Sequence, residues 1–142
     1  MSNPVELVLL NRPSEIARVH DLLEAISREH AFESKSLHEF QSAVEEYLTN
    51  VFRYAFTDGQ EHEVVVRLQM DGPNLEMEIK DDGRPFNLLE HPAPDLTLPL
   101  DQRPIGGLGI YMIRQSVDGI EYRRMGGKNV VVMSKRFRAA AR

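Results

Sequence analysis

One stretch of the chain places a carboxylate and an amide one helical turn apart. Glu46 and Asn50 are separated by four positions, so on a helix they share one face. An amide oxygen suits a hard cation such as Mg²⁺, whose other ligands are commonly phosphate oxygens and water. The neighbouring carboxylate could orient water or take a proton from an attacking hydroxyl. Arg53, almost one turn further on, could meet a phosphate. Alone, this pattern is also typical of an ordinary solvated helix face.

A second group, Asp81-Asp82-Gly83, follows a short run of alternating apolar residues. A carboxylate held at the end of a strand could accept a hydrogen bond from an exocyclic amine. Gly83 has no Cβ, so a flat ring could approach its backbone closely. Taken by itself, however, the same sequence is more typical of a simple turn.

The third group is a glycine run, Gly106-Gly107-Leu108-Gly109, ahead of an apolar helical pattern. A helix start offers unpaired N–H groups and a favourable dipole to an anion, and glycines let the backbone approach it. The run is not a P-loop, because no Gly-Lys-Ser or Gly-Lys-Thr follows it. It also does not open a βαβ unit with a ribose-binding acid, which argues against a dinucleotide fold.

The elements that must position these groups are predicted by apolar periodicity. We expect a strand at 5–10, a helix from Pro13 to about residue 29 and a second helix at 34–55. A hairpin of 64–68 and 75–79 follows, then a helix beginning at the glycine run. Two closing strands lie at about 119–124 and 129–137. We predict one α+β domain over 1–142, a two-layer α/β sandwich. Its mixed, mainly antiparallel sheet carries three helices on one face.

The segment between the second and third groups lacks periodicity. Five prolines fall there, and we interpret about residues 86–105 as a lid over the site. The overall composition argues against several other kinds of site and protein. The chain has 142 residues, no cysteine and a net charge of −5, which disfavours disulfides, thiolate metal sites and direct nucleic-acid binding. We see no membrane span and no signal peptide, so we expect a cytoplasmic protein.

Together, in this order and spacing, the three groups resemble the motifs of the GHKL ATPase family, which has the Bergerat fold. Glu46-x-x-x-Asn50 resembles its N box, while Asp81-x-Gly83 and Gly107-x-Gly109 resemble its two glycine boxes. The resemblance covers about residues 37–135. Within the family, the chain looks most like the anti-sigma-factor serine/threonine kinases.

The resemblance implies a role for each matching residue. Glu46 would be the catalytic base, and Asn50 would bind Mg²⁺. Asp81 would accept a hydrogen bond from the adenine amino group, with Gly83 under the ring. The phosphates of ATP or ADP would contact the remaining residues, namely Arg53, Gly107, Leu108 and Gly109.

Two positions depart from the family pattern. Asn129 lies where many members have a threonine beside the adenine, so we assign it no contact. Tyr54 stands where the subfamily often has histidine, and its role stays open.

The implied function is a protein kinase that phosphorylates a small STAS-type anti-sigma-factor antagonist and sequesters a sigma factor, as a homodimer. Two alternatives remain: a nucleotide-dependent interaction module with little kinase activity, or a partner-switching kinase in a pathway without a sigma factor. Having both Glu46 and Asn50 favours catalysis over simple binding.

Overall fold

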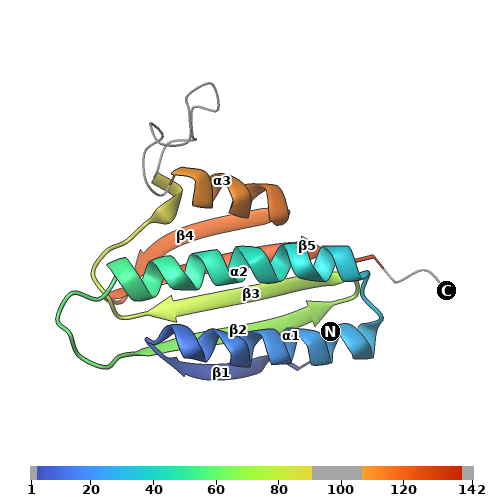
Figure 1. The fold of residues 1–142 in the computed structure, drawn as a ribbon, viewed down its shortest axis with the longest axis horizontal. Helices are drawn as coiled ribbons and strands as arrows, with labels where there is room; N and C mark the ends of the chain where they lie inside the picture. Colours follow the sequence, from blue (N-terminus) through green and yellow to red (C-terminus); the bar gives the residue numbers. More distant parts are fainter. Residues whose placement is uncertain (1–2, 91–106, 139–142) are drawn as a thin grey trace.

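In the described part of the chain, five strands form a single sheet, and three α-helices cover one of its faces (Figure 1). The structure is a computed structural model that describes residues 3–90 and 107–138. The elements, in chain order, are β1 (Val5–Leu10), the short 3-10 helix η1 (Pro13–Glu15), α1 (Ile16–His30), α2 (Ser34–Tyr54), β2 (Glu63–Asp71), β3 (Asn74–Asp81), the 3-10 helix η2 (Leu88–Glu90), α3 (Gly107–Ser116), β4 (Gly119–Met125) and β5 (Lys128–Arg136).

The strand order across the sheet is β1-β2-β3-β5-β4. All four pairings of this sheet are antiparallel, and β1 forms one edge. The β2–β3 and β4–β5 pairs are hairpins, whereas β3 and β5 are brought together only by the fold. The predicted two-layer α+β sandwich is therefore confirmed, and the sheet that we predicted to be mixed and mainly antiparallel has only antiparallel pairings among the described strands.

The period of two along β3 decides which of its residues face the helices. Leu75, Met77 and Ile79 are fully buried in the layer between sheet and helices. Asp81 is the next residue in the same alternation, and its side chain is buried as well. A carboxylate is thus carried into the core layer by the register of the strand.

Helix α2 is the central helix of the covering layer. It packs beside α1 and α3, and its apolar side, including Phe40, Val44 and Leu48, is buried. Among the residues that the structure describes, no helix has the length and apolar character needed to cross a membrane. Of the predicted lid, residues 91–105 lie outside the described residues, and Leu88–Glu90 form η2.

Candidate functional site

The first and third sequence groups meet where α2 faces the beginning of α3. On α2, the Asn50 amide Nδ2 donates hydrogen bonds to the Glu46 backbone oxygen at 2.7 Å and to Glu46 Oε1 at 3.1 Å. On α3, a Cβ built on Gly109 would lie only 2.2 Å from Glu46 Oε1. Position 109 therefore accepts only glycine while Glu46 keeps this place. The carboxylate, the amide and the glycine form one cluster.

Asp81, from the second group, is buried, and the described residues give hydrogen-bond partners to only one of its two oxygens. Its Oδ1 accepts hydrogen bonds from the Gly83 N–H and from Asn129 Nδ2, both at 2.9 Å. Its Oδ2 is buried and has no hydrogen-bond partner among the described residues. Burial raises the pKa of Asp81, and the bonds from Asn129 and Gly83 oppose that rise. Within the described part of the chain, this oxygen is a buried acceptor without a donor.

The turn after β3 is fixed to the end of α2. A Cβ built on Gly83 would lie 2.5 Å from the Ala55 carbonyl oxygen, so this close approach requires glycine. The Arg84 N–H donates to that same oxygen at 2.8 Å, and Arg84 Nε donates to the Tyr54 carbonyl at 2.7 Å. These bonds satisfy carbonyls that the helix end leaves free. Asp81 is consequently held in a fixed position relative to the helix of Glu46 and Asn50.

Asn129 organises this part of the site, although no role was predicted for it from the sequence. Its Nδ2 donates to Asp81 Oδ1 at 2.9 Å and to the Arg84 carbonyl at 2.8 Å. Its Oδ1 accepts from the Phe86 N–H at 3.1 Å and from the Tyr122 hydroxyl at 2.6 Å. The amide thus uses its full hydrogen-bonding capacity. Only the pairing of Asp81 with Asn129 across β3 and β5 would have revealed this role.

For three residues that we predicted to contact phosphates, the structure gives the position in the fold but does not test the contact. Arg53 is exposed, and its guanidinium carbon lies 5.9 Å from the centre of the Tyr54 ring. Gly107 and Leu108 begin α3, so the predicted glycine-led helix start is present. The phosphate contacts proposed for these three residues remain predictions.

His62 joins the loop after α2 to the turn that follows β3. Its Nε2 lies 2.7 Å from Asp58 Oδ2, its Nδ1 lies 3.1 Å from Asp82 Oδ1, and its ring stacks on Phe56. The hydrogen bond with Asp58 is the main cause of a raised pKa for His62. His62 is therefore a structural residue whose two ring nitrogens both have carboxylate partners.

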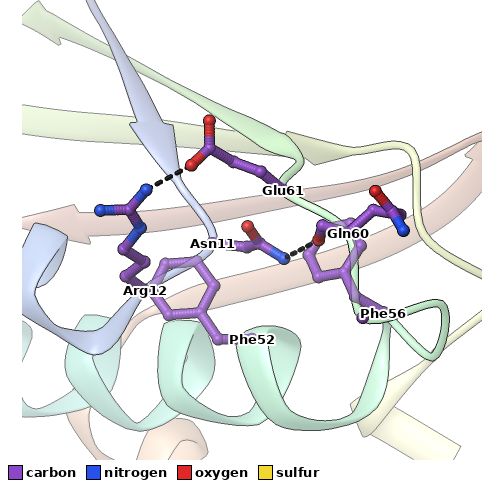
Figure 2. A pocket seen from close by; sticks show the side chains of 7 residues that line it. Asn11, Arg12, Phe52, Phe56, Gln60 and Glu61 are labelled. Atoms are coloured by element: carbon purple, nitrogen blue, oxygen red, sulfur yellow. Dashed lines mark hydrogen bonds and ion pairs between the residues drawn. The ribbon is translucent and has the colours of Figure 1, made fainter.

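A separate cavity of about 370 Å³ lies near the end of α2 (Figure 2). Arg12 and Glu61 form an ion pair across it, and Asn11 Nδ2 donates to the Gln60 carbonyl at 3.2 Å. Its full lining is Asn11, Arg12, Phe52, Phe56, Gly59, Gln60 and Glu61. It shares no residue with the cluster of Glu46, Asn50 and Gly109, and Asp81 does not line it.

The sandwich fold is that of the histidine kinase-like ATPases. The chain belongs to the family described as "Histidine kinase-like ATPase domain", whose model matches residues 9–135. It is 25% identical to the serine-protein kinase RsbW of Listeria monocytogenes serovar 1/2a over 136 residues, covering 93% of this chain and 87% of that protein. It is also 25% identical to RsbW of Bacillus pumilus over 134 residues, covering 90% and 83%.

Two further similarities are more limited. The serine/threonine-protein kinase BtrW of Bordetella bronchiseptica is 26% identical over 90 residues, which is 63% of each chain. A crystal structure of the RsbU and RsbW domains of Rv1364c from Mycobacterium tuberculosis matches with a TM-score of 0.67 and 15% identity. The match covers 98% of this chain and 34% of that one, and it supports the fold.

Proposed function

We propose that this chain binds ATP with Mg²⁺ and transfers the terminal phosphoryl group to a serine or threonine of a partner protein. The observation that carries the proposal is the cluster itself. Glu46 and Asn50 are hydrogen-bonded to each other and lie against Gly109 at the start of α3, while Asp81 keeps a buried oxygen without a partner among the described residues. Membership of the ATPase family and similarity to serine-protein kinases support it.

The residues present suit a nucleotide in three respects. The Asp81 Oδ2 is an acceptor for the adenine amino group. The beginning of α3 provides N–H groups for phosphate oxygens. Asn50 carries an amide oxygen for Mg²⁺, since its hydrogen bonds to Glu46 use only its nitrogen. Bound Mg²⁺ would supply neutralisation of phosphate charge, while Arg53, Leu108 and the two glycines would contact the phosphates.

In the transfer step, Glu46 takes the proton of the attacking hydroxyl. The hydroxyl oxygen then bonds to the terminal phosphorus of ATP, the bond from that phosphorus to the bridging oxygen breaks, and ADP leaves. Phosphoryl transfer depends mainly on positioning and on charge stabilisation. The Asn50 side chain keeps Glu46 in place through its 3.1 Å hydrogen bond.

The partners follow from the resemblance. We propose that the phosphorylated protein is a STAS-type anti-sigma-factor antagonist, that the chain also sequesters a sigma factor, and that it acts in the cytoplasm as a homodimer. Direct nucleic-acid binding is not proposed, given the net charge of −5. A kinase in a pathway without a sigma factor remains an alternative, as does an interaction module with little turnover.

The decisive experiment compares Glu46→Gln with Glu45→Gln, an equivalent change at the exposed neighbouring position. Phosphoryl transfer from ATP to a co-purified STAS protein is measured, together with ADP affinity. Loss of a general base lowers the rate about 100-fold or more, so we expect this loss for Glu46→Gln with little change in ADP affinity. Glu45→Gln should behave as the original chain.

Full transfer by Glu46→Gln would exclude the assigned base. ATP binding without any transfer by the unaltered chain would favour the interaction module. Recovery of neither a sigma factor nor a STAS protein from the native cell, with ATP or ADP present, would contradict the proposed partners.

A further inference from the structure

A small polar cluster lies inside the layer between α2 and the sheet. Its members are Tyr47 on α2, Asp81 on β3, Tyr122 on β4 and Asn129 on β5. Tyr47 is 1% exposed and Asp81 is 2% exposed. Buried polar groups in proteins are almost always hydrogen-bonded, so each atom of this cluster should have a partner.

Most of the cluster meets that requirement. The Tyr122 hydroxyl donates to Asn129 Oδ1 at 2.6 Å, and Asn129 Nδ2 donates to Asp81 Oδ1 at 2.9 Å. Two buried atoms, the Tyr47 hydroxyl oxygen and Asp81 Oδ2, have no partner among the described residues. An unpaired buried polar group costs about 1–3 kcal/mol. The described residues therefore leave both atoms available to a further hydrogen-bond partner.

The protonation state of Tyr47 decides what it can offer. Burial raises the pKa of Tyr47 well above 10.0, and the nearby charges of Asp81 and Tyr122 raise it further. Tyr47 therefore keeps its proton at neutral pH and is a hydrogen-bond donor. Asp81 Oδ2 is an acceptor. Tyr47 belongs to the same buried core cluster as Ile79, which precedes Asp81 by two positions on the same face of β3.

We propose that Tyr47 and Asp81 together read the edge of the adenine base. The Tyr47 hydroxyl donates to ring nitrogen N1, and Asp81 Oδ2 accepts from the adjacent amino group. Guanine presents the reverse pattern, with an oxygen at position 6 and a hydrogen on N1, so the pair selects adenine. This inference rests on the proposed nucleotide-binding function and makes Tyr47 a specificity-determining residue.

The test measures the affinity of the full chain for ADP and for 1-deaza-ADP, which lacks the N1 acceptor. The unaltered chain should bind 1-deaza-ADP about tenfold more weakly than ADP, as expected for a lost buried hydrogen bond. Tyr47→Phe should bind ADP about tenfold more weakly and should no longer distinguish the two ligands. Tyr111→Phe, which removes the hydroxyl of an exposed tyrosine on α3, is the matched control and should keep the preference for ADP.

The possible results separate the two proposals. If Tyr47→Phe keeps the preference of the unaltered chain for ADP over 1-deaza-ADP, the role of Tyr47 is refuted, whereas ADP binding that weakens in Asp81→Asn still supports the nucleotide site. If the unaltered chain binds no adenine nucleotide, both proposals are refuted. A thermal melt of each variant shows whether it is folded.

Discussion

Replacing Asp81 by asparagine should change stability and nucleotide binding in opposite directions. In the unliganded protein, Asp81 is a buried carboxylate with one oxygen unpartnered among the described residues, and burial raises its pKa. The change Asp81→Asn removes the buried charge and keeps an Oδ1 acceptor for Gly83 and Asn129. We expect Asp81→Asn to increase the free energy of unfolding by about 1 kcal/mol at pH 7. For a chain of this length, the melting temperature should rise by about 3 °C.

The effect should depend on pH in a defined direction. A carboxyl group whose pKa is raised by folding destabilises the folded state once it is ionised. The advantage of Asp81→Asn should therefore be absent below the ordinary value of 3.8 and should develop as the pH rises through the raised pKa. Thermal melts between about pH 3.5 and pH 7.5 measure it. Asp21→Asn, on the exposed side of α1, is the control and should change little.

Whereas Asp81→Asn should increase stability, it should weaken nucleotide binding. The adenine amino group would lose a hydrogen bond to a charged acceptor and would face an amide that can present a donor. We expect the affinity for ADP to fall roughly 100-fold. Added Mg²⁺ and ADP should then stabilise the unaltered chain but hardly stabilise Asp81→Asn. A variant that melts at a clearly lower temperature without ligand, or that binds ADP with unchanged affinity, would refute this reasoning.

Two further changes test the scaffold. Ala31 ends α1 with φ of 54°, a conformation that costs non-glycine residues about 1 kcal/mol. Ala31→Gly should therefore raise the melting temperature. Ala25→Gly, at an exposed position within α1, is the control and should lower the melting temperature. A fall on Ala31→Gly would contradict the first expectation. The raised pKa of His62 means that its protonated form stabilises the fold fully below pH 6.5, and this contribution is lost as the pH rises through the raised pKa. The difference in melting temperature between the unaltered chain and His62→Gln should therefore shrink with rising pH, and a constant difference would exclude pairing with Asp58 and Asp82 as its cause.

Local patterns predicted the elements well because each depends on neighbouring residues. The strand at Val5–Leu10 and the two long helices follow from apolar periodicity, and the glycine-led start of α3 was expected from its sequence. The beginning of the first helix was less accurate, since Pro13–Glu15 form a 3-10 turn before α1. Such short terminal turns differ little from an α-helix in sequence.

The pairing of distant strands could not be predicted from local sequence patterns. Nothing near Asn129 in the sequence indicates that it lies opposite Asp81, because β3 and β5 are separated by η2, α3 and β4. Tyr47 resembles an ordinary core aromatic on the apolar side of α2, and only its lack of a hydrogen-bond partner among the described residues distinguishes it. Both residues depend on which side chains meet, and that is a property of the assembled layers.

The sequence alone therefore determined which residue types are available for nucleotide chemistry and on which elements they lie. Glu46 and Asn50 share a helix face through their spacing, and Asp81 ends a strand through its alternation. The tertiary structure decided that Gly109 fits against Glu46 and that, among the described residues, Asp81 has hydrogen-bond partners on one oxygen and none on the other. The physical reason is that spacing fixes neighbours along one element, whereas burial and hydrogen-bond partners depend on the elements that pack around it.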